Sequence, residues 1–228
     1  MWGRGAIMEL ILDTADLDEI KKLGAMLSVD GVTTNPTIIA QSGKTFDEVR
    51  DSLFALLEPE QKVFFQVIST DYEGIMEEAR YIASLREDNI FAKIPATHDG
   101  LRAVKDCVAE GVHVLCTAIS SASQGFMAAK NGADYLAIYI NRMSNQGDGV
   151  EETVLLQTML DAVGLPTKVM GASLKNAWQI NQLIAHGIDA VTLPVPLVYS
   201  MIDQPGTIAA RDVFNDNWEH AFGKRTLR

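Results

Sequence analysis

Apolar and polar positions along the chain alternate between two kinds of segment. Short runs rich in apolar and β-branched residues are separated by longer segments in which apolar residues recur with helical spacing. Several short runs are apolar on both faces, which is typical of strands in a parallel sheet that helices cover. The short runs lie at residues 9–13, 31–35, 63–69, 90–96, 113–119, 135–141, 168–173 and 190–195.

Eight strand-helix units without a linker or a shift in composition predict a single-domain α/β fold, a (β/α)8 TIM barrel. The alternative is a doubly wound open sheet. That fold favours a glycine-rich phosphate turn after the first strand, and residues 12–19 (LDTADLDE) contain no glycine. We therefore expect a closed barrel over residues 8–228.

An extra helix is predicted after the last strand, over about residues 207–223. Phe214, Trp218 and Phe222 recur there every four residues, which gives the helix one apolar stripe. The spacing fits two arrangements equally well. The stripe either packs on its own barrel or packs on a neighbouring subunit.

The composition is that of a globular protein, with 228 residues, 47% hydrophobic and 21% charged. The net charge of −11 repels phosphate backbones and anionic lipid, so nucleic acid and membrane surfaces are not expected partners. An anionic small substrate would need a local cationic pocket.

Targeting and metal-binding signals are weak. Residues 1–7 (MWGRGAI) lack the apolar core of a signal peptide, so we expect an N-terminal extension or an artificial remnant before Met8 and a cytoplasmic location. Cys107 and Cys116 are too few for a disulfide framework, and we expect both to be small core residues. The histidines are scattered and predict no metal site; they are His98, His113, His186 and His220.

The predicted strands end in polar residues, and the active site of such a barrel lies at those ends. The candidates are Asp13, Thr33, Asn35, Gln66, Lys93, Thr117, Tyr139, Arg142 and Ser173. Lys93 is the most diagnostic, because it interrupts the apolar strand IFAKIPA. Burial there would lower the pKa of its amine and supply a neutral nucleophile for a carbonyl. The structural alternative is a lysine that reaches solvent or pairs with a carboxylate.

Several motifs in order resemble the transaldolase family and, within it, the small fructose-6-phosphate aldolase branch. They are LDTAD at 12–16, GVTTNPTII at 31–39, IFAKIPATHDGLRAVK at 90–105, IYINR at 138–142, GASLK at 171–175 and TLP at 192–194. The resemblance implies a Schiff-base enzyme with no metal and no organic cofactor. It also implies a homo-oligomer, a decamer of two pentameric rings, with the C-terminal helix reaching a neighbour.

The resemblance assigns the carbonyl chemistry to four residues. Lys93 would form an imine with a ketose carbonyl and make it an electron sink. Gln66, Thr117 and Tyr139 would position the water that serves proton transfer and imine hydrolysis.

Substrate binding is implied for the other candidates. Asp13, with Thr33 and Asn35, would hold donor hydroxyls and help to move protons near the lysine. Arg142 and Ser173 would bind the substrate phosphate and so provide the local cationic pocket.

Two positions favour the aldolase branch. The family's transaldolases carry Glu and Phe where this chain has Gln66 and Tyr139, and a phenol can act on the enamine carbon and release a free ketone. We therefore expect cleavage of fructose 6-phosphate to dihydroxyacetone and glyceraldehyde 3-phosphate. The alternatives are a transaldolase and a non-catalytic sugar-phosphate-binding barrel. Ser120 and Ile138 depart from the family pattern beside the pocket, which bears on acceptor preference.

Overall fold

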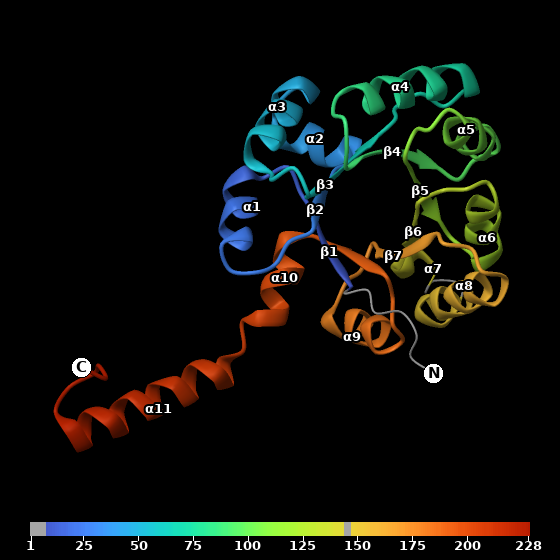
Figure 1. Cartoon of the computed structure of the whole chain (residues 1–228). Coiled ribbons are helices and arrows are strands. Elements are labelled where there is room, and N and C mark those ends of the chain that lie inside the picture. Colours follow the sequence, from blue (N-terminus) through green and yellow to red (C-terminus); the bar gives the residue numbers. More distant parts are fainter. Residues whose placement is uncertain (1–7, 144–146) are drawn as a thin grey trace.

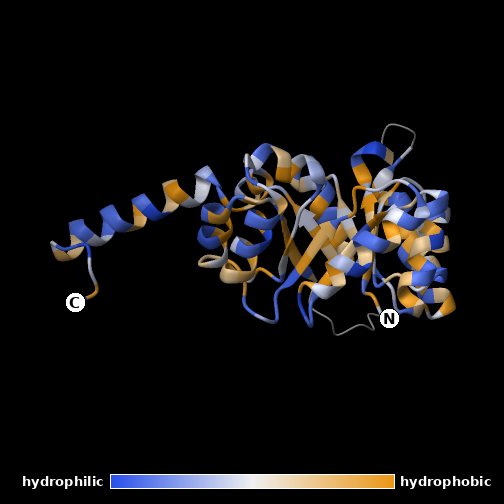
Figure 2. Ribbon diagram, turned by 90° about the horizontal axis from the view of Figure 1, so that it is seen from above, coloured by the Kyte–Doolittle hydropathy of each residue, from blue (hydrophilic) through white to orange (hydrophobic). Residues whose placement is uncertain are grey.

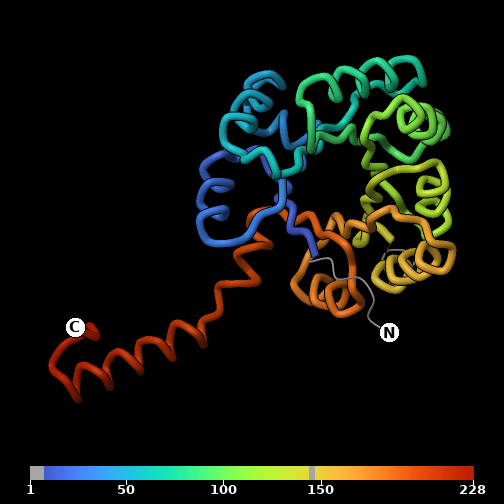
Figure 3. The backbone as a smooth tube through the Cα atoms, viewed as in Figure 1, coloured from blue at the N-terminus to red at the C-terminus, as the bar shows by residue number. Residues whose placement is uncertain are grey.

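The computed structural model describes residues 8–143 and 147–228. Eight parallel strands form one closed barrel in sequence order, and β8 returns to pair with β1 (Figures 1 and 3). The predicted (β/α)8 barrel is therefore confirmed. The strands are β1 (Glu9–Asp13), β2 (Gly31–Thr33), β3 (Lys62–Gln66), β4 (Ile90–Pro95), β5 (Val114–Ile119), β6 (Tyr135–Tyr139), β7 (Lys168–Ala172) and β8 (Ala190–Leu193).

Helices surround the barrel on its outer face, and the last of them projects away from it (Figure 1). They are α1 (Leu17–Gly24), α2 (Pro36–Ser42), α3 (Phe46–Leu56), α4 (Tyr72–Ser84), α5 (His98–Ala109), α6 (Ala122–Lys130), α7 (Ile140–Met143), α8 (Gly149–Val163), α9 (Ala177–Ala185), α10 (Val195–Ile202) and α11 (Pro205–Phe222). Polar side chains that accept backbone N–H groups fix where helices begin after the strands. Asp16 does so for α1, Asn35 for α2, Thr97 for α5, Ser121 for α6 and Asn176 for α9.

The middle of the barrel interior is apolar and separate from the core between strands and helices. It includes Ile11, Phe64, Phe91, Leu115, Met170 and Ala190. The Phe64 and Phe91 rings stack with centroids 4.7 Å apart, and Tyr135 meets Phe91 edge-on at 5.2 Å. This layer closes the barrel below the strand ends, so it is a packed core and not a pore.

A charged network fills the barrel floor, at the N-terminal ends of the strands. Glu9 is 9% exposed and accepts a hydrogen bond of 2.8 Å from the Tyr135 hydroxyl. Lys168 Nζ and Lys62 Nζ lie 2.5 and 3.4 Å from Glu9 Oε1. Burial raises the pKa of Glu9, but the hydrogen bonds from Lys168 and Tyr135, together with the charges of Lys168 and Lys62, outweigh burial and lower it. The N-terminal end of such a barrel usually contributes to stability and not to catalysis.

The C-terminal helix α11 projects away from the barrel (Figures 1 and 2). None of its residues is buried, and Phe214 and Phe222 are 68% and 59% exposed. Trp218 contacts Phe222 along the same stripe, with ring centroids 4.4 Å apart. Packing of the stripe on its own barrel, one of the two predicted arrangements, is therefore wrong.

Two sequence expectations fall on other parts of the chain. The predicted extension over residues 1–7 lies outside the described residues. Cys107 and Cys116 are buried and unpaired, as expected of core residues. Within residues 8–143 and 147–228, no helix has the length and apolar character needed to cross a membrane.

Candidate active site

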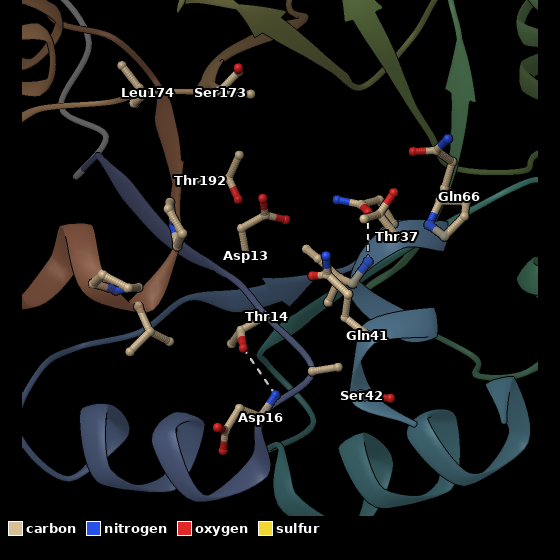
Figure 4. Close-up of a pocket in the computed structure, with 18 of the residues that line it drawn as sticks. Asp13, Thr14, Asp16, Thr37, Gln41, Ser42, Gln66, Ser173, Leu174 and Thr192 are labelled. Atoms are coloured by element: carbon tan, nitrogen blue, oxygen red, sulfur yellow. Dashed lines mark hydrogen bonds between the residues drawn. The ribbon is translucent and has the colours of Figure 1, made fainter. Parts of the chain in front are cut away.

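A cavity of about 1070 Å³ opens at the C-terminal ends of the strands. Seven of the nine predicted residues line it: Asp13, Asn35, Gln66, Lys93, Tyr139, Arg142 and Ser173. Figure 4 shows Asp13 near its centre, with Gln66 and Ser173 at its margin. The topology therefore brings together polar residues that are far apart in the sequence.

Lys93 lies in the fourth register position shared by β3 and β4, beside Gln66. Its side chain is 5% exposed, and its Nζ contacts Thr33 Oγ1 at 3.3 Å and the Thr34 carbonyl oxygen at 3.2 Å. Within the described chain no carboxylate forms an ion pair with this amine. The alternative of a lysine that reaches solvent or pairs with an acid thus does not hold.

Burial governs the charge of Lys93 and Asp13. Burial lowers the pKa of the Lys93 amine, and the nearby Asp13 carboxylate only partly opposes this effect. Burial raises the pKa of Asp13, with Lys93 acting in the opposite direction. Both shifts act in favour of the neutral forms, which suits an amine that attacks a carbonyl and a carboxyl group that exchanges a proton beside it.

Thr33 and Thr117 do not line the cavity wall. Thr33 is 1% exposed and contributes through its contact with Lys93. Thr117 is fully buried, and its Oγ1 has no hydrogen-bond partner in the described part of the chain. The pairing of β5 with β6 shifts register just after it, where Ala118 has a left-handed φ of +58°.

Asn35 and Gln66 present amide groups to the cavity. The Asn35 Oδ1 accepts the N–H of Ile38 at 3.0 Å, which orients the side chain at the start of α2. Its NH₂ group has no protein partner among the described residues and is available to a ligand. Pro36 follows at the first helical position, where its lack of an N–H is harmless.

Cationic groups gather on the side of the cavity formed by β6 and β7. The Arg142 guanidinium lies 4.9 Å from the centroid of the Tyr139 ring, because α7 begins directly after β6. Ser173 follows β7 with a left-handed φ of +55°, a strained conformation for a residue with a side chain. Lys175 also lines the cavity, and within residues 8–143 and 147–228 it forms no ion pair.

Lys175 and Thr192 are among the cavity residues that the sequence reasoning did not name. Lys175 stands two residues after Ser173 in the GASLK motif, and its charge near a strand end was a usable signal. Alternate side chains of β8 point into the barrel, and Thr192, two residues after Ala190, is the last of them. The strand-end rule that selected the other candidates would have found it.

The fold and the site define a class of (β/α)8 barrel protein whose cavity holds a buried lysine among hydroxyl, amide and carboxyl groups. The chain belongs to the transaldolase/fructose-6-phosphate aldolase family, whose sequence model matches residues 10–226. A "probable fructose-6-phosphate aldolase" of Streptococcus pneumoniae (strain ATCC 700669 / Spain 23F-1) is 40% identical over 214 residues, which cover 92% of this chain and 96% of the relative. The resemblance found in the motifs is confirmed, and the family is one of enzymes.

Two solved structures share the fold at low identity. One, described as "Native KDPGal structure", has a TM-score of 0.57 at 15% identity, covering 85% of this chain and 84% of its own. The other is a cube-shaped, highly porous protein cage designed by fusing symmetric oligomeric domains. It has a TM-score of 0.56 at 14% identity, covering 96% of this chain and 80% of its own. Both support the barrel architecture and nothing finer.

Proposed function

We propose that the chain is a class I aldolase that reversibly cleaves fructose 6-phosphate to dihydroxyacetone and glyceraldehyde 3-phosphate. The observation that carries the proposal is the Lys93 amine, which is buried and unpaired with any described carboxylate, and whose pKa is lowered by that burial. Family membership and the identity to a probable fructose-6-phosphate aldolase support the same reaction.

The proposed reaction begins when the Lys93 amine attacks the C2 carbonyl of the open-chain sugar. Asp13, in its neutral form, protonates the hydroxyl of the resulting carbinolamine, and loss of water leaves a protonated imine and an ionised Asp13. The imine accepts the electron pair of the C3–C4 bond as that bond breaks. Asp13 takes the proton of the C4 hydroxyl, and glyceraldehyde 3-phosphate leaves. The Tyr139 phenol then protonates the enamine carbon. Water hydrolyses the protonated imine, which releases dihydroxyacetone and free Lys93 and returns a proton to the Tyr139 phenolate.

Phosphate binding is assigned to Arg142 and Ser173, with Lys175 added from the cavity wall. Arg142 can offer two parallel N–H donors to phosphate oxygens, and Lys175 adds a second charge. These cations allow a chain of net charge −11 to hold an anionic sugar. Replacing Lys175 by methionine should weaken binding of fructose 6-phosphate about tenfold or more and leave imine formation with dihydroxyacetone intact.

A transaldolase would use the same imine but keep the three-carbon unit until an aldose accepts it. Tyr139 favours the aldolase, because a phenol at the cavity wall can protonate the enamine. The test is to incubate the protein with fructose 6-phosphate, with and without erythrose 4-phosphate. We expect equimolar dihydroxyacetone and glyceraldehyde 3-phosphate without the acceptor. Products that form only when erythrose 4-phosphate is present would identify a transaldolase instead.

A non-catalytic sugar-phosphate-binding barrel would give neither product while still binding phosphate. The Lys93→Met variant is the matched negative control, and Lys175→Met is a second lysine replaced at the same cavity. Lys93→Met should lose all cleavage, whereas Lys175→Met should regain rate at high substrate. Equal cleavage by Lys93→Met and the parent protein would refute the lysine mechanism.

The exposed helix α11 supports the proposal of a homo-oligomer, a decamer of two pentameric rings in which α11 packs on a neighbour. Large apolar side chains such as Phe214 and Phe222 are exposed along an 18-residue helix none of whose residues is buried. Sedimentation analysis tests the assembly. A monomer would contradict it, and removal of residues 205–228 should reduce the assembly size.

A further inference from the structure

Asp13 and Thr192 lie on neighbouring strands of the barrel, and each holds a buried polar atom without a partner. The β1–β8 register places Ile11 opposite Thr192, so Asp13 is the next inward residue along β1. Both residues line the cavity, and in Figure 4 the Thr192 hydroxyl is turned toward the Asp13 carboxyl. Over the described residues, Asp13 Oδ1 and Thr192 Oγ1 make no hydrogen bond.

Other hydroxyl donors on the strands beside Asp13 are already engaged or absent in the described part of the chain. On the β2 side, the Thr33 hydroxyl donates to the Thr34 carbonyl oxygen at 3.3 Å and accepts from Lys93. On the far side of Thr192, the inward residue at the end of β7 is Ala172, which has no polar side-chain atom. Thr192 is therefore the free hydroxyl donor on the strands that flank Asp13.

A buried acceptor and a buried donor are each costly without a partner, and pairing them removes both costs. We propose that Thr192 is a positioning residue, whose hydroxyl donates to Asp13 Oδ1 and directs Oδ2 into the cavity. A hydrogen bond to the carboxylate stabilises its ionised form. Asp13 would then meet the substrate as a base at a fixed place beside Lys93. The catalytic consequence rests on the proposed aldolase function.

Several ionisable groups share the cavity with Asp13 and face it from the surrounding elements. They are Asp16 and Asp18 near α1, Lys44 after α2, Lys93 on β4, Tyr139 on β6, Arg142 on α7 and Lys175 after β7. Lys93 is the group whose charge acts on Asp13. Thr192 is uncharged, so a change there alters the titration of Asp13 without altering the charge of the cavity.

The first test compares Thr192→Val, which removes the donor and keeps the shape, with Thr192→Ser, which retains the donor. For Thr192→Val, the acidic limb of the pH profile of kcat/KM should move up by about one pH unit, because Asp13 loses a hydrogen bond to its charged form. Thr192→Ser should restore the parent profile. Coincident profiles for all three proteins would overturn the proposal.

The second test measures the titration of the Asp13 carboxyl group in the absence of catalysis. Carbon-13 NMR of labelled aspartate carboxyl groups gives the Asp13 titration, assigned by the signal lost in Asp13→Asn. Thr192→Val should raise the midpoint of that titration and Thr192→Ser should not. An unchanged midpoint in Thr192→Val overturns the hydrogen bond whatever the enzyme's activity, whereas a shifted midpoint in a protein that cleaves no fructose 6-phosphate overturns only the proposed function.

Discussion

Replacing Lys93 by methionine should abolish imine chemistry and at the same time stabilise the fold. The amine is 5% exposed, holds only two contacts beyond 3.1 Å and has no described carboxylate as an ion-pair partner. Its charged form is therefore poorly compensated in the folded state, while a methionine of similar length removes that cost. A lysine required by catalysis is thus expected to lower stability.

The expected change in stability can be sized from the replacement of buried ionic groups in other proteins. Replacing such groups by well-packed apolar side chains stabilises proteins by up to about 4 kcal/mol. For a chain of this length, about 1 kcal/mol moves the Tm by about 2 to 4 °C. We expect Lys93→Met to gain about 1 to 4 kcal/mol and to melt about 3 to 12 °C higher.

The pH dependence of stability provides a second check that Lys93 destabilises the folded state. Because burial lowers the folded-state pKa of Lys93 below its ordinary value of 10.5, the unfolded chain binds more protons in the pH range between the two pKa values. The penalty from Lys93 should therefore shrink as pH rises toward that ordinary value. In Lys93→Met this component disappears, so the advantage of the variant should be largest at neutral pH and decline in alkali.

Lys168→Met is the matched control, since it removes another barrel lysine that is paired with Glu9. Because Lys168 is 38% exposed, solvent reduces the effect, and we expect a loss of about 1 to 2 kcal/mol. Thermal unfolding followed by circular dichroism, with urea titration at pH 7, measures both variants. A Lys93→Met protein that is destabilised like Lys168→Met would refute the reasoning about burial.

Three further changes test other parts of the site and barrel. Tyr139→Phe should slow release of dihydroxyacetone by about 100-fold or more, as expected for a lost proton donor, while the Lys93 imine still forms in borohydride trapping; unchanged release would remove Tyr139 from the mechanism. Glu9→Gln should reduce the loss of stability that accompanies a fall in pH. The lowered pKa of Glu9 makes its contribution present above pH 4.5 and lost as pH falls further, which acid titrations of both proteins can compare. Gly100→Ala places a Cβ 1.9 Å from the Pro95 carbonyl oxygen at the end of β4, so it should lower the Tm and cleavage rate together, whereas Gly24→Ala meets no atom within 4 Å and should not.

The sequence contained enough information to locate most of the cavity. Lys93 stands out because a charged residue in an apolar strand has no inexpensive route to water, and the strand-end rule collects Asp13, Gln66 and Tyr139 around it. The rule fails for Thr33 and Thr117, which do not line the cavity wall; beside Thr117 the β5–β6 pairing shifts register. Periodicity alone does not report such local irregularities.

Other features depend on contacts that no local pattern contains. Glu9 meets Tyr135 and Lys168 across 126 and 159 residues of sequence, so only closure of the barrel brings the floor network together. The stripe on α11 has the same spacing whichever surface it covers, and only the projection of the helix excludes its own barrel.

The most direct test of the central claim is reductive trapping of the imine. The parent protein is treated with borohydride and dihydroxyacetone or fructose 6-phosphate, and the modified residue is located by peptide mass spectrometry. We predict a donor-derived adduct on Lys93, absent in Lys93→Met and retained in Lys175→Met. A folded protein that forms no adduct on Lys93 with either compound would contradict the Schiff-base account.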